Sequence, residues 1–179
     1  MEVRFVSLDL ARLDAQRMEM LALPFFEDER PLRGAAGLCD WRLCGALSRI
    51  VGSERVRGDV GEVLLVPGRP RLAFEKVVLF GQGPAAAFDG DVAAVVLDRV
   101  LRTLDGLRLR SMALSLPGRG SGRAAPAEAM RWFLRALESA PDIDEVLVVD
   151  DLEAQRAMVP VIEAARRGVR VVRARETDA

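Results

Sequence analysis

The chain has 179 residues, of which half are apolar and 30% are charged, and its formal net charge is −1. This length and composition predict a single globular domain with a sizeable core. A charge near zero argues against a general nucleic-acid or membrane-surface binder, because such proteins need a basic excess. No apolar run reaches the roughly 18 residues of a membrane span, and the N-terminus lacks a basic-then-apolar signal pattern, so we expect a cytoplasmic protein.

Several residue types that carry out chemistry are missing. The sequence has no His, Tyr or Asn, and Lys76 is its only lysine. Without His, Ser–His and Cys–His catalysis and imidazole metal sites are excluded. Cys39 and Cys44 form neither a CxxC pair nor half of a zinc knuckle, so we expect reduced thiols. We expect no metal ion and no cofactor.

Apolar periodicity predicts an alternation of strands and helices. Strands are expected over residues 3–8, 18–26, 62–66, 74–80, 112–116, 146–149 and 169–172, and helices over residues 39–51, 91–104, 126–138 and 152–167. Pro24 indicates that the second strand lies at an edge or is ending, and Pro160 must bend the last helix or mark its first turn. The helix over 91–104 is apolar nearly all round, so we expect it to be well buried.

The strand–helix alternation in the second half of the chain implies right-handed crossovers and a largely parallel sheet. The first half has tighter connections, which favour a mixed sheet. We therefore predict an α/β fold with three layers, α/β/α. The domain is expected to span residues 1–175, followed by a polar tail over 176–179.

A glycine-rich elbow between the strand over 112–116 and the helix that starts at Pro126 is the first candidate site. Glycine-rich turns that lead into a helix N-terminus can bind phosphate through backbone N–H groups. The candidate ligands are consecutive residues of the turn: Gly118, Arg119, Gly120, Ser121, Gly122 and Arg123. The alternative is a strand-to-helix turn that needs glycine only because it is tight.

A second candidate is Asp150-Asp151, a carboxylate pair after a buried strand. Such a pair could hold Mg²⁺ and support an enzyme, or one carboxylate could cap the next helix. Acidic residues around 142–153 and arginines around 166–175 separate charge along the C-terminal part. This separation is typical of a solvated face and could support self-association, but without interleaved aromatic residues it does not favour nucleic acid.

The run from Leu21 to about Pro117 resembles the N-terminal domain of the leucine aminopeptidase family of metallopeptidases. The matching segments include 25–28, 61–66 and 77–81, which read FFED, GEVLLV and VVLFG. That domain has a fold similar to the macrodomain, a module known for ADP-ribose binding. The elbow also resembles a macrodomain loop, with Pro117, Ser121-Gly122, Pro126 and Glu128 at the matching positions. Two further macrodomain-like positions are Gly83, before Pro84, and Asp9, whose equivalent contacts adenine.

Departures from these families bear on activity. The resemblance implies that the aminopeptidase metals and catalytic Lys and Arg belong to a second, C-terminal domain. Its signature, NTDAEGR, does not occur in this sequence. Macrodomain hydrolases use an Asn-rich loop, and this chain contains no Asn. We therefore expect neither aminopeptidase activity nor ADP-ribosyl hydrolysis by the usual routes.

Three hypotheses follow from the sequence. The first is a non-catalytic macrodomain-like module that acts through contacts with a protein partner or by self-association. The second is a module that binds ADP-ribose or a nucleotide phosphate through the Gly118–Arg123 loop, with Asp9 or Gly83 contributing. The third is a metal-dependent enzyme that uses Asp150-Asp151. None of them involves nucleic acid or a membrane.

Overall fold

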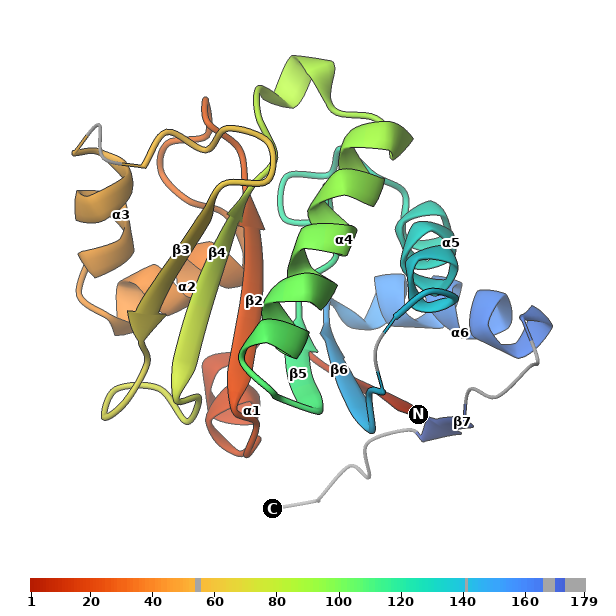
Figure 1. The fold of residues 1–179 in the computed structure, drawn as a ribbon. Helices are drawn as coiled ribbons and strands as arrows, with labels where there is room; N and C mark the ends of the chain where they lie inside the picture. Colours follow the sequence, from red (N-terminus) through yellow and green to blue (C-terminus); the bar gives the residue numbers. More distant parts are fainter. Residues whose placement is uncertain (54–55, 141, 166–169, 173–179) are drawn as a thin grey trace.

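Seven strands form one mixed sheet in a computed structural model that describes residues 1–53, 56–140, 142–165 and 170–172. The strand order is β3-β4-β2-β5-β6-β1-β7, and only β3 runs antiparallel to its neighbour (Figure 1). The strands are β1 (Glu2–Val6), β2 (Met20–Phe25), β3 (Val63–Pro67), β4 (Lys76–Gly81), β5 (Ser111–Leu114), β6 (Glu145–Val149) and β7 (Arg170–Val172).

Helices cover both faces of this sheet, which confirms the predicted three-layer α/β/α fold (Figure 1). One face packs against α4 (Gly90–Gly106), α5 (Pro126–Leu137) and α6 (Leu152–Ala164). The other packs against α1 (Leu10–Asp14), α2 (Gly34–Arg42) and α3 (Ala46–Val51), and a short 3₁₀ turn, η1 (Ala85–Ala87), precedes α4. The predicted tail over 176–179 lies outside the described residues.

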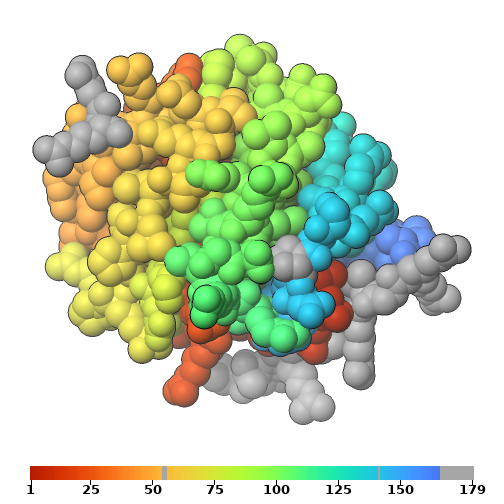
Figure 2. Space-filling model, viewed as in Figure 1, coloured from red at the N-terminus to blue at the C-terminus, as the bar shows by residue number. Residues whose placement is uncertain are grey.

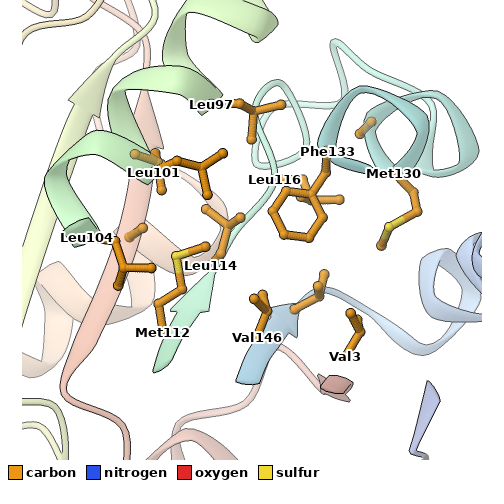
Figure 3. Close-up of a cluster of buried hydrophobic side chains, with 14 of the residues drawn as sticks. Val3, Leu97, Leu101, Leu104, Met112, Leu114, Leu116, Met130, Phe133 and Val146 are labelled. Atoms are coloured by element: carbon orange, nitrogen blue, oxygen red, sulfur yellow. The ribbon is translucent and has the colours of Figure 1, made fainter. Parts of the chain in front are cut away.

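Alternation along the central strands divides the core into two clusters. In β5, Met112 and Leu114 face α4 and α5, whereas Ala113 faces α1 to α3. Figure 3 shows the first cluster, in which Leu116 lies beside Phe133 of α5 at the start of the elbow. Because central parallel strands are buried on both faces, they read as continuous apolar runs rather than as alternating ones.

The single helix predicted over 39–51 is wrong, because two helices occupy this region. α2 ends at Arg42, and Cys44 and Gly45 follow with φ angles of 56° and 75° before α3 begins. This left-handed backbone stops a helix, and glycine adopts it at little cost. Both cysteines are free: Cys44 is exposed, while burial raises the pKa of the Cys39 thiol to about 12, so this thiol stays protonated.

Pro24, α4 and Pro160 differ in part from the expectations. β2 is a central strand, so Pro24 does not mark an edge, but the alternative that the strand is ending is confirmed, because β2 ends at Phe25. Pairing with β5 stops at Ala22, so the missing N–H of Pro24 removes no bond on that side. In α4 the predicted burial holds for one face only, since Val95 is 50% exposed. Pro160 lies inside α6, eight residues beyond its first residue, and not in its first turn.

No helix in the part of the chain that the structure describes is long and apolar enough to cross a membrane.

Candidate functional site

The glycine-rich elbow lies where the parallel strands of the sheet end. It runs from Ser115 to Ala125 and connects β5 to α5 (Figure 1). Ligands of open α/β sheets usually bind at this carboxyl edge of the strands, which makes the elbow a candidate site. Pro126 occupies the first turn of α5 as predicted, and Ala125 provides no side-chain cap to that helix.

The backbone N–H groups of the elbow are largely bonded within the chain. The amide of Gly118 donates to Gln82 Oε1 at 2.8 Å, and that of Arg123 donates to the Gly118 carbonyl at 2.8 Å. The amides of Arg119, Gly122 and Ala124 donate within the elbow, and that of Ser115 donates to the Ala22 carbonyl. Within the Gly118–Arg123 loop, the amides of Gly120 and Ser121 have no such partner among the described residues. Most donors that an anion would need are therefore already satisfied.

Arg119 connects the elbow to the end of β6. Its Nε and Nη2 atoms donate to the two carboxylate oxygens of Asp150, at 2.7 and 3.2 Å, and its Nη1 atom donates to the Ala124 carbonyl at 2.8 Å. The two side chains are only 12% and 9% exposed. A two-point guanidinium–carboxylate pair is both strong and directional. Arg119 therefore neutralises a buried carboxylate and is not free for a phosphate.

The first turn of α2 covers the middle of the elbow. A Cβ atom built on Gly34 would lie 2.8 Å from the Cα atom of Gly120, and one built on Gly120 would lie 3.6 Å from the Arg33 carbonyl oxygen. These separations are those of two backbones in van der Waals contact. The approach requires glycine at position 34, whereas a Cβ atom at position 120 would make only an ordinary van der Waals contact, and the approach closes the elbow from this side.

A carboxylate lies beside the Ser/Arg end of the elbow. The Glu29 side chain is 12% exposed and pairs with Arg33 at 3.6 Å. Burial raises the pKa of Glu29; the charges of Arg33 and Arg123 and the neighbouring Ser121 hydroxyl partly offset this. Within the described residues the buried Ser121 Oγ makes no well-formed hydrogen bond. A carboxylate at this place disfavours a bound anion, whereas Arg123 is exposed and available to one.

An aromatic cluster supports the elbow on the α4 and α5 side. The Phe88 ring packs against Gly118, where any Cβ atom would overlap it. Phe88 also stacks edge-to-face with Phe26 and Trp132, at centroid distances of 5.2 and 6.1 Å. The Gly118 amide also donates to the buried Gln82 side chain. This packing is enough to explain the glycine at position 118, so no ligand is needed to account for it.

Gly83 and Asp9, the two outlying candidates, are engaged in local structure. Gly83 donates its N–H to the Gly58 carbonyl at 2.7 Å, and its own carbonyl accepts from the Glu27 amide at 3.0 Å. Asp9 caps α1 by accepting from the Arg12 amide at 3.0 Å. Among the described residues, neither makes a backbone hydrogen bond to the elbow. Their roles as nucleotide ligands remain predictions.

Asp150 and Asp151 each make a different structural contact. Asp150 holds Arg119, while Asp151 caps α6 by accepting from the Ala154 amide at 2.8 Å. The capping alternative is therefore confirmed for Asp151. Among the described residues, no three Cys, Asp or Glu side chains are grouped as a metal site would require.

Sequence reasoning missed three residues that shape the elbow: Gly34, Gln82 and Phe88. Gln82 lies 36 positions from its partner Gly118, and the Arg119–Asp150 pair spans 31 positions. Such contacts leave no periodic signal in a single sequence. The GQGP segment predicts a turn, but a buried glutamine between two glycines offered a signal that pattern analysis did not use.

Comparison with known proteins identifies the sequence family. The model of the cytosol aminopeptidase family, N-terminal domain, matches residues 22–141. A probable cytosol aminopeptidase from Pseudomonas aeruginosa is 31% identical over 129 residues, which are 72% of this chain and 25% of the relative. A second, from Synechocystis, is 27% identical over 56% of this chain and 20% of the relative. The chain thus spans about a quarter or less of these relatives.

Solved structures show the same fold at low identity. The macrodomain of Thermus aquaticus DarG has a TM-score of 0.63 and 21% identity, and the match covers 82% of this chain and 97% of that one. An Oceanobacillus iheyensis macrodomain with ADP has a TM-score of 0.67 and 14% identity, covering 86% and 87%. A Trypanosoma brucei macrodomain in complex with ADP-ribose has a TM-score of 0.66 and 18% identity, covering 82% and 64%.

The two comparisons agree with the fold described above. The family match covers most of the seven-stranded domain, including the elbow and α5. At this sequence identity, the structural likeness shows the macrodomain fold alone. The chain belongs to the cytosol aminopeptidase family and carries its N-terminal domain, which has a macrodomain fold.

Proposed function

We propose that this domain is a non-catalytic module that acts through protein contacts, either by self-association or by binding an aminopeptidase partner. One observation supports the proposal: most groups of the elbow that could bind a phosphate are paired within the chain. Arg119 is paired with Asp150, Gly34 packs on Gly120, and the Glu29 carboxylate lies beside Ser121. A domain whose elbow groups are paired with each other still has its outer surfaces available to bind another protein.

The composition supports the same proposal. The sequence has no His, Tyr or Asn and a single Lys, so the usual catalytic side chains of hydrolases are scarce. The matched family region is the N-terminal domain, and the relatives are named cytosol aminopeptidases, which supports a cytoplasmic location.

Analytical ultracentrifugation tests this function. The chain would be sedimented alone over a range of concentrations and then mixed with the full-length aminopeptidase from the same cell. We expect either a mass above 19.6 kDa for the chain alone or co-sedimentation with the enzyme. A chain that remains monomeric in both experiments would contradict a role in assembly.

ADP-ribose binding is the second candidate function. The buried Ser121 hydroxyl without a well-formed bond and the exposed Arg123 favour it, as does the α5 N-terminus without a side-chain cap. Two of the structural neighbours were solved with ADP or ADP-ribose. These features compete with the internal pairing of Arg119 and the nearby Glu29 carboxylate.

Calorimetric titration with ADP-ribose separates the two candidates. We expect no heat of binding and no change in melting temperature at millimolar ligand, because Arg119 and most elbow amides are already paired within the chain. Saturable binding that is lost in Arg123→Ala but kept in Arg131→Ala, a control at an exposed arginine on α5, would favour the second candidate instead.

A further inference from the structure

The outer edge of β3 is unpaired within the described part of the sheet. β3 is the terminal strand, and its one strand neighbour is the antiparallel β4 (Figure 1). The register pairs Leu64 with Leu79 and Val66 with Val77. Two backbone hydrogen bonds show which residues of β3 bond to β4: the Gly81 amide donates to the Glu62 carbonyl, and the Gly68 amide donates to the Glu75 carbonyl.

Antiparallel strands alternate between residues that bond inward and residues that bond outward. Glu62 and Gly68 bond to the β4 side, so Leu64 and Val66 do the same. Val63 and Leu65 consequently direct both backbone groups to the free edge, while Pro67 directs only a carbonyl there. The edge therefore offers two N–H donors and three carbonyl acceptors to an added strand.

This edge is only partly protected. Edge strands of soluble proteins are normally guarded by charged residues, proline, bulges, short length or coverage by another element, and β3 has only its short length and Pro67. β3 reads VLLVP and has no charge. Three apolar side chains around it are strongly exposed: Val60 by 42%, Leu65 by 46% and Val95 by 50%. Figure 2 shows this part of the chain, in yellow, at the surface beside the green of α4.

Two of these side chains, Leu65 and Val95, lie on the α4 face of the sheet. Val63, two residues before Leu65, packs into the cluster on the α4 side, and alternation places Leu65 on that same side. Val95 of α4 is close to the segment before β3, since a Cβ atom on Gly61 would lie 3.9 Å from Val95 Cγ1. The free edge is thus bordered by an apolar surface, which we call the β3 surface: Val63, Leu65 and Val95.

Charges at the two ends of β3 make the edge complementary to itself. Asp59 lies before the strand and Arg69 after it, and both are exposed. When two copies of β3 pair antiparallel across a two-fold axis at Leu64 or Leu65, the acidic end of each copy meets the basic end of the other. Such an isologous contact uses the same surface twice.

We propose that two copies of this chain associate through antiparallel pairing of their β3 edges. The Val63 and Leu65 amides of each copy donate to outward carbonyls of the other, and the β3 surfaces join across the axis. This inference rests on the proposed assembly function and specifies its partner as a second copy. Because five-residue strands bury little area, the dimer belongs to the class of weak interfaces, below about 1,200 Å² in total.

Sedimentation equilibrium from low to several hundred micromolar chain tests the proposal. The weight-average mass is expected to rise from 19.6 kDa toward twice that value. Leu65→Lys should hold the mass at the monomer value, because it places a charge in the interface. Leu152→Lys is the matched control, since Leu152 is 53% exposed on α6, and it should dimerise like the wild type.

Charge reversal provides a test that does not depend on the apolar surface. Asp59→Arg and Arg69→Asp should each weaken association, and the double variant should restore it. Circular dichroism would verify that each variant is folded. A monomeric wild type, or a dimer that Leu65→Lys leaves intact, would overturn the β3 proposal. If the monomeric chain still co-sediments with the aminopeptidase, the proposed function survives while this inference fails.

Discussion

Replacing Asp150 with alanine is expected to lower the free energy of unfolding by about 3 to 5 kcal/mol, the usual cost of removing one partner of a buried ion pair. The Arg119 guanidinium would keep its place under the elbow, 12% exposed, with no carboxylate to neutralise it. Its remaining bond, to the Ala124 carbonyl, does not compensate a charge. The loss should also loosen the connection between the elbow and β6.

Urea denaturation of Asp150→Ala and Asp151→Ala would measure this effect against a neighbouring control. Asp151 is exposed and caps α6 through the Ala154 amide, so its removal should cost only about 1 kcal/mol. The difference between the two variants isolates the buried pair from the general effect of losing a carboxylate at this helix start. Equal losses would mean that the Arg119–Asp150 pair contributes no more to stability than a helix cap does.

Replacing Gly34 with alanine is expected to cost about 2 to 4 kcal/mol, from left-handed strain together with backbone crowding. Gly34 has a φ of +55°, and the added Cβ atom would lie 2.8 Å from the Cα atom of Gly120. Since that neighbour is backbone, the clash cannot be relieved by a side-chain rotation. Either α2 or the elbow has to shift.

Gly122→Ala is the matched control, because Gly122 has a φ of +70° and its Cβ position has no atom within 4 Å. It should therefore show the strain alone, about 1 to 2 kcal/mol. Both variants would be compared by urea denaturation. If they lose the same stability, α2 does not press on the elbow, and the closed arrangement is wrong.

Local patterns were sufficient to predict most of the fold. The apolar run around Val146 and the i, i+3, i+4 spacing of Met130, Phe133 and Leu134 correspond to β6 and α5. The sequence pattern failed at a helix boundary that is set by backbone conformation. Leu43 and Leu47 keep helical spacing across Cys44-Gly45, so periodicity alone did not detect the left-handed residues that separate α2 from α3.

The glycines predicted where the elbow lies, but not that contacts from other segments close it. Its location at the carboxyl edge of the sheet follows from the strand–helix alternation. Its closure depends on Asp150, Gln82 and Gly34, which approach it from distant parts of the chain. No composition or spacing rule joins such residues, because their proximity is a product of the sheet order. The resemblance to macrodomains supplied the expected position of the loop and not its partners.

Amide hydrogen exchange followed by NMR would report on the elbow residue by residue. In a closed elbow, the amides of Gly118 and Arg123 are hydrogen-bonded within the chain and should be protected. Gly120 and Ser121, whose amides have no such partner among the described residues, serve as references in the same loop and should exchange much faster. If Gly118 and Arg123 instead exchange as fast as Gly120, the elbow is open in solution and its amides are free to bind a phosphate.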